Sequence, residues 1–127
     1  MNRFKELKVW QKSVDLATEV YLITSKFPSE EKFGLISQIN RSAVSIASNI
    51  AEGAGRASKK EFYNFLSIAN GSSYELETQL TIASNLNFIK EETFKKIIDI
   101  VAEIQKMIYA LKKSLKSEVS QNSLLKT

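Results

Sequence analysis

Apolar residues recur at alternating spacings of three and four along four long segments of this chain. An α-helix repeats every 3.6 residues, so this spacing places the apolar side chains of a segment along one helical face. No strand-like alternation of apolar and polar residues competes with it. The pattern therefore predicts an all-α protein. The stripes are Leu7, Trp10, Val14, Ala17 and Tyr21, with Leu16, Val20, Ile23 and Phe27 beside them in one broad face; Ile36, Ile39, Ala43, Ile46 and Ile50; Phe62, Leu66, Ala69, Ser73, Leu76, Leu80 and Ala83; and Phe94, Ile97, Val101, Ile104, Ile108, Leu111 and Leu115.

The helix boundaries follow from one proline and four glycines, which fall mostly where helices would have to end. Pro28 ends the first helix, Ser29 is a suitable N-cap for the second, and Gly53 is a natural C-terminal glycine. Ser58 and Glu61 have the spacing of a capping box, so the third helix begins there. The predicted helices cover residues 7–27, 30–52, 59–85 and 91–116.

Short connections make consecutive helices antiparallel neighbours, so an up-down-up-down antiparallel four-helix bundle is the simplest closed arrangement. A mean apolar period near 3.5 also lets neighbouring helices pack side by side at about 20°. We expect residues 1–116 to form this single domain. The stripe is lost after residue 116, so residues 117–127 are predicted to be a flexible C-terminal tail.

The chain contains no histidine and no cysteine. Histidine is the side chain that titrates near neutrality and the commonest nitrogen ligand of metals, so zinc hydrolase sites, Ser-His-Asp triads and di-iron bundle sites are excluded. Glu52, Glu75 and Glu77 are the carboxylates nearest to unusual polar positions, but their spacing specifies no reaction. We therefore predict a protein that is not an enzyme and has no metal or cofactor.

The longest apolar runs span only a few residues, far fewer than the roughly 20 that cross a bilayer. The N-terminus lacks the apolar region of a signal peptide. These features predict a cytoplasmic protein with no membrane partner, and the absence of cysteine agrees with that compartment.

A polar row follows the second helix beside its apolar stripe. Short uncharged side chains dominate it, whereas a solvated helix face usually carries many lysines and glutamates. Such side chains suit either close packing against the third helix or hydrogen bonds to a partner, and both interpretations stay open here. The row is Gln38, Arg41, Ser42, Ser45, Ser48, Asn49 and Glu52. The predicted packing or subunit seam consists of Gln38, Ser42, Ser45, Asn49, Glu52, Gly71, Ser72 and Glu75.

Poor helix formers interrupt the middle of the third helix, at Asn70-Gly71-Ser72-Ser73. Glycine alone costs about 1 kcal/mol relative to alanine in a helix. We interpret Gly71 as a close-packing position that admits a neighbouring backbone or a ring such as Trp10. On this interpretation Gly71→Ala destabilises the protein despite its better helix propensity.

A formal net charge of +4 permits attraction to nucleic acid. The candidate footprint for nucleic acid or another partner is Arg41, Arg56, Lys59 and Lys60. A second cluster, at Lys112, Lys113 and Lys116, is interpreted as a solvated face. Aromatic residues for base stacking are not visibly interleaved with these cations, because Phe62 and Phe65 are assigned to the core stripe.

Four short motifs stand out along the chain. They are Leu7-x-Val9-Trp10-x-Lys12, Gln38-x-x-Arg41-Ser42-Ala43-x-Ser45-Ile46, Asn49-Ile50-Ala51-Glu52-Gly53 and Ala69-x-Gly71-Ser72-x-x-Glu75-Leu76. Together they resemble a small bacterial family of four-helix bundles, the proteins encoded in intervening sequences of 23S rRNA genes, also called S23 ribosomal protein-like. The resemblance covers residues 4–115. A more distant resemblance is to the accessory variability determinant of diversity-generating retroelements.

The resemblance implies a homopentamer arranged as a ring or barrel, a link to RNA or to a reverse transcriptase, and no enzymatic activity. Our leading hypothesis is a non-catalytic homo-oligomeric binding protein with RNA or DNA as candidate ligands. The alternative is a protein-recruiting adaptor or accessory subunit for a nucleic-acid enzyme such as a reverse transcriptase. An enzyme that uses Glu52, Glu75 or a tyrosine ranks third.

Overall fold

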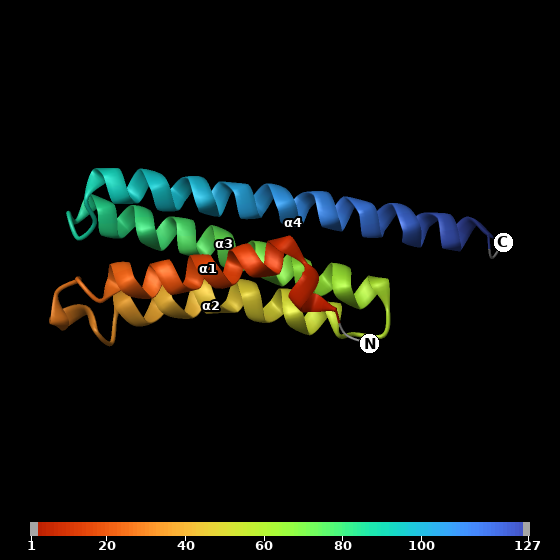
Figure 1. The fold of residues 1–127 in the computed structure, drawn as a ribbon, viewed down its shortest axis with the longest axis horizontal. Helices are drawn as coiled ribbons and strands as arrows, with labels where there is room; N and C mark the ends of the chain where they lie inside the picture. The colour runs from red at the N-terminus through yellow and green to blue at the C-terminus, as the bar shows by residue number, and fades with distance from the viewer. Residues whose placement is uncertain (1–2, 126–127) are drawn as a thin grey trace.

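The computed structural model describes residues 3–125, with side chains described as far as Ser117. Within these residues the chain forms four α-helices and no strand (Figure 1). The helices run up, down, up and down around one core, and each contacts its neighbours in the order α1, α2, α3, α4 and back to α1. The predicted all-α, antiparallel four-helix bundle is confirmed. The elements are η1 Phe4–Glu6, α1 Lys8–Thr24, η2 Ser29–Glu31, α2 Leu35–Ala54, α3 Lys59–Asn85 and α4 Glu91–Leu125, where η denotes a 3-10 helix.

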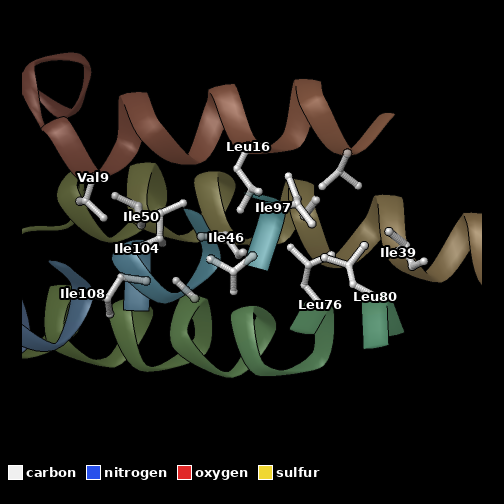
Figure 2. Close-up of a cluster of buried hydrophobic side chains, with 14 of the residues drawn as sticks. Val9, Leu16, Ile39, Ile46, Ile50, Leu76, Leu80, Ile97, Ile104 and Ile108 are labelled. Carbon is white, nitrogen blue, oxygen red and sulfur yellow. The ribbon is translucent and has the colours of Figure 1, made fainter. Parts of the chain in front are cut away.

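The core follows the predicted stripes of α2, α3 and α4 (Figure 2). Ile46 of α2, Leu76 of α3 and Ile104 of α4 are fully buried among the side chains that fill the bundle. Burying one such side chain contributes about 1.5–3 kcal/mol. In α1, however, Leu16 is buried while Tyr21 of the predicted stripe is 50% exposed. The buried side of α1 is therefore centred on Leu16 and Val20, at one side of the broad predicted face, and Tyr21 lies outside the core.

The turn between α1 and α2 differs from the prediction at both ends. α1 ends at Thr24 rather than at residue 27, and Phe27 packs with Phe88 at 5.5 Å between ring centroids. The second helix does not begin at residue 30 with Ser29 as its cap; it begins at Leu35. Gly34, with φ −109° and ψ −107°, leaves the helical region and separates η2 from α2.

Gly53 does not end α2, which continues to Ala54. It is buried instead at a close approach to α3, where an added Cβ would lie 2.6 Å from Phe65 Cβ. α3 begins as predicted, because the backbone N–H of Glu61 donates to Ser58 Oγ at 3.1 Å.

α4 continues past residue 116 to Leu125, through a part of the predicted tail that contains neither proline nor glycine. A helix can propagate through such a sequence without a packed face because each residue adds one backbone hydrogen bond. Residues 126–127 of the tail lie outside the described residues, and tail flexibility stays a prediction. Across the part of the chain that the structure describes, no helix is both long and apolar enough to span a bilayer.

Candidate functional site

The inward half of the polar row ties α2 to α3. Ser45 Oγ and Ser72 Oγ lie 2.8 Å apart across the two helices. Asn49 Nδ2 donates to the Ser45 carbonyl at 2.8 Å and to Ser45 Oγ at 2.9 Å. Ser42 is buried beside them. Small side chains let the helices approach closely, and α2 and α3 accordingly share the most extensive contact in the bundle. For these residues the packing interpretation is correct.

The outward half of the row stays in solvent in a single copy of the chain. Gln38, Arg41, Ser48 and Glu52 are all exposed on α2. Arg41 lies roughly 20 Å from Arg56 along the helix direction, at about 1.5 Å per residue. The structure therefore does not bring the four predicted cations into one footprint, because Arg41 stands apart.

Gly71 is exposed on the outer surface of α3, and an added Cβ there would meet nothing within 4 Å. Trp10 packs instead against Phe4, with ring centroids 5.1 Å apart. The interpretation of Gly71 as a packing glycine within the bundle is therefore wrong. The outer surface of α3 has no neighbouring helix, so nothing in a single copy requires glycine at this position.

An apolar groove runs along the outside of α1 and α2, lined by Val14, Tyr21, Leu22 and Val44 among others. It continues toward Phe33, whose side chain is 90% exposed and borders a second hollow that also includes Tyr21 and Arg41. We name this region the α1–α2 apolar surface. Sequence reasoning missed it because Tyr21 was assigned to the core. The available signal was Phe33, a large apolar residue between Lys32 and Gly34 in a turn.

A second exposed region lies on α3 around Gly71. A shallow hollow there is lined by Gly71, Tyr74, Glu75, Ile82 and neighbouring residues. Tyr74 is 55% exposed and Ile82 46% exposed. We name this region the α3 surface. It holds three members of the predicted seam, Gln38 of α2 with Gly71 and Glu75 of α3, and all three face solvent rather than the bundle interior.

The candidate carboxylates do not form a catalytic pair. Glu52 accepts from Arg56 at 2.6 Å, and Glu77 accepts from Gln105 Nε2 at 3.0 Å. Glu52 and Glu75 are also far apart. Gly53, next to Glu52, lies against Phe65 of α3. Phe65 precedes Glu75 by ten residues, which is ~15 Å along the helix. Among the described residues no group of three acidic, histidine or cysteine side chains could hold a metal ion.

Three of the four cations of the predicted footprint, Arg56, Lys59 and Lys60, lie at the same end of the bundle as the C-terminal lysines. Arg56 pairs with Glu52, and its guanidinium carbon lies 4.9 Å from the centroid of the Phe65 ring. Phe62 packs against the core, whereas Phe65 is a half-buried ring at the α2–α3 corner that does not belong to the core cluster. Assigning Phe65 to the core stripe was therefore wrong.

The two clusters meet across α3 and α4. Lys112 Nζ lies 5.0 Å from the centroid of the Tyr63 ring. Lys59 and Lys60 form the first turn of α3, one turn before Tyr63, and both are exposed. Antiparallel packing thus brings cations separated by more than fifty positions in the sequence to one end of the bundle.

The model of the 23S rRNA-intervening sequence protein family matches residues 5–110 of this chain. A similar solved structure is a protein of unknown function from the S23 ribosomal protein family of Bacteroides thetaiotaomicron. It shares 29% identity and a TM-score of 0.76 with this chain, over 83% of this chain and 95% of that one. No curated protein matches the chain. The more distant resemblance to the accessory variability determinant of diversity-generating retroelements stays a prediction. The resemblance to the intervening-sequence proteins is confirmed, and the chain belongs to the family of 23S rRNA-intervening sequence proteins.

Proposed function

We propose that this chain is a non-catalytic cytoplasmic protein that assembles with copies of itself and uses the assembly to bind a ligand. The observation that carries the proposal is the presence of two separate exposed surfaces with large apolar side chains. They are the α1–α2 apolar surface, with Phe33 and Tyr21, and the α3 surface, with Tyr74 and Ile82. Contiguous apolar patches on a small protein mark interaction sites.

The two surfaces differ, as a cyclic assembly requires of the faces that meet at each contact. Lys32 and Arg41 lie at the α1–α2 apolar surface, whereas Glu75 lies at the α3 surface. Opposite charge beside apolar side chains favours one surface docking on the other and disfavours contact between identical surfaces. The family resemblance adds a subunit count of five, arranged as a ring.

Gly71 supports the same proposal. An exposed glycine in the middle of a helix costs about 1 kcal/mol relative to alanine, and nothing within a single copy offsets that cost. A neighbouring copy whose backbone or ring approaches α3 closely would account for it. The inward residues Ser45 and Ser72 would then hold α2 and α3 together behind the contact.

The first test is the mass of the purified chain in solution at micromolar concentration, measured by sedimentation equilibrium. The proposal expects a homo-oligomer, and a monomer would contradict it.

Arg41→Glu and Glu75→Arg should each weaken assembly at least about tenfold, because each places like charges together. The double variant should recover much of the loss. Lys96→Glu is the matched control, on an exposed position of α4 outside both surfaces.

Nucleic acid is the ligand that the charge distribution favours, because Arg56, Lys59 and Lys60 share one end of the bundle with the C-terminal lysines. Lysines and arginines that neutralise phosphates give binding that weakens steeply with salt. Titration of the oligomer with RNA and DNA at increasing salt tests this. Binding that does not respond to salt would contradict a phosphate ligand.

The alternative is an adaptor or accessory subunit for a nucleic-acid enzyme such as a reverse transcriptase. The exposed apolar surfaces also suit a protein partner that docks a helix on the bundle. A purified enzyme of that class that binds the chain after nuclease treatment, and loses binding on Phe33→Ser, would favour this function over direct nucleic-acid binding.

A further inference from the structure

We infer that single-stranded nucleic acid binds along one face of α3 and α4, at the end of the bundle where α3 begins. This face, here named the α3–α4 basic face, consists of Tyr63, Lys106, Tyr109, Lys112, Lys113 and Lys116. The inference rests on the nucleic-acid part of the proposed function and is independent of self-assembly. The inference places the nucleic-acid contact on α3 and α4, away from Arg41 and Arg56 of the footprint predicted from the sequence.

The stretch of α4 from residue 104 to residue 117 carries charge of one sign, and Glu118 follows it. Residues 104–117 contain four lysines and neither aspartate nor glutamate. Lys106, Tyr109, Lys113 and Lys116 recur at spacings of three and four, so they share one helical face. All four side chains are exposed. This part of α4 therefore presents a row of cations with an aromatic ring among them.

α3 adds a second ring to the same face. Tyr63 is half-buried against the core, and Lys112 Nζ lies 5.0 Å from the centroid of its ring. Lys112 itself is partly buried. The contact fixes the position of α3 relative to the lysines of α4. It also shows that cations and aromatic rings are interleaved here, which the sequence did not indicate.

Carboxylates border this face on several sides. Glu77 of α3 accepts from Gln105 Nε2 at 3.0 Å, and Glu103, three residues before Lys106, pairs with Lys12 of α1 at 2.9 Å. Asp99 precedes Lys106 by two turns, while Glu61 in the first turn of α3 and Glu118 of α4 adjoin the lysines in the sequence. Glu91 and Glu92 occupy the first turn of α4, at the other end of the bundle. Lysines still outnumber carboxylates near the start of α3, so the net charge there is positive.

The combination of lysines and exposed tyrosine favours a single strand over a duplex. Tyr109 is 66% exposed, so its ring can receive an unpaired base. Stacking on an aromatic side chain requires a base that is not already stacked in a helix, and it tolerates any sequence. Arg56 contributes less, because Glu52 pairs with its guanidinium at 2.6 Å. Arg41 lies on the α1–α2 apolar surface instead.

The test is fluorescence anisotropy with a labelled single-stranded oligonucleotide of about ten nucleotides and mixed sequence, compared with the same sequence as a duplex. Each is titrated with the intact chain at several salt concentrations. A neutralised phosphate contributes about −0.7 to the slope of log K against log salt for a single strand. Lys113→Gln/Lys116→Gln should therefore reduce the slope by about 1.4 and weaken binding several-fold at physiological salt.

Tyr109→Ala should weaken single-strand binding by about tenfold without changing the salt slope, since stacking releases no counterion. Its exposure makes a folding defect unexpected. Lys90→Gln/Lys96→Gln is the matched control: it removes the same charge from exposed lysines at the other end of the bundle. This control should leave the slope and the affinity nearly unchanged.

Tight low-salt binding that none of these substitutions alters would overturn the inference while leaving the nucleic-acid function in place. Equal affinity for duplex and single strand, with no effect of Tyr109→Ala, would overturn the single-strand assignment. Absence of binding even at low salt would overturn the nucleic-acid function as well. The solution mass of the chain reports on self-assembly separately in every case.

Discussion

Gly53 and Gly71 mark two regions of the bundle in which the same residue has opposite surroundings. At the end of α2, a Cβ on Gly53 would come within 2.6 Å of Phe65 Cβ and 2.9 Å of Phe62 Cδ1. In the middle of α3, a Cβ on Gly71 would meet nothing within 4 Å. Gly53 is therefore needed for the packing of one chain, whereas Gly71 has no such role there. The difference separates residues that build the bundle from residues available to a partner.

The largest expected effect is that of Gly53→Ala. The new methyl group would overlap Phe65 Cβ, which sits next to the backbone and cannot move without α3, so the free energy of unfolding should fall by about 3 kcal/mol. Urea denaturation followed by circular dichroism measures this. An unchanged midpoint would show that α2 and α3 have room to separate. Gly53 would then not be required for the packing of the bundle.

The second effect concerns assembly. Gly71→Leu places a bulky side chain on the α3 surface without a clash inside the chain. We expect the dissociation constant of the oligomer to rise at least about tenfold, equivalent to ~1.4 kcal/mol, while far-ultraviolet circular dichroism stays unchanged. Sedimentation velocity across a dilution series is the measurement. Unaltered assembly would remove Gly71 from the contact.

Gly71→Ala makes the same chemical change as Gly53→Ala, but its effect on the free energy of unfolding should have the opposite sign. Under dilution to the single chain, alanine should raise the free energy of unfolding by up to about 1 kcal/mol through its helix propensity. The denaturation has to be run at low protein concentration, because assembly itself stabilises the folded chain. A loss of stability under these conditions would restore a packing role for Gly71 within the bundle.

The smallest effect is expected at the α2–α3 seam. Ser45→Ala removes the partner of Ser72 Oγ and one of the two acceptors of Asn49 Nδ2, which should cost roughly 0.5–1 kcal/mol. Ser45→Ala/Ser72→Ala should cost less than the sum of the two single variants, because neither partner is then left without a hydrogen bond. Chemical denaturation of the double-mutant cycle measures the coupling. Strict additivity would show that the two hydroxyls do not interact in solution.

Local signals in the sequence predicted well what depends on neighbours along the chain. The capping pair Ser58 and Glu61 placed the start of α3 correctly, because a cap is satisfied within one turn. The stripe through Ile97, Val101 and Ile104 predicted the buried face of α4. Gly34 was not recognised as a break, since a glycine near the start of a helix does not by itself reveal its backbone angles.

The candidate site was predicted only in part. The structure places Ser42, Ser45 and Ser72 at the contact of α2 with α3, whereas Gly71 lies on the outer surface of α3. Tyr21 belongs to a broad apolar segment in which a rotation by one residue, about 100°, exchanges buried and exposed positions. Periodicity alone could therefore not show that Tyr21 lies at the α1–α2 apolar surface. The contact of Lys112 with Tyr63 joins two helices and had no local signal.

The sequence by itself determined the all-α class, the four helices, most of the core and the family, because helix formation and apolar periodicity are properties of consecutive residues. The rotation of each helix and the neighbours of each polar side chain were decided only by the tertiary structure. Packing settles those features through contacts between distant residues, such as Ser45 with Ser72 and Gly53 with Phe65. For this reason the exposed apolar surfaces and the α3–α4 basic face became visible only in the folded bundle.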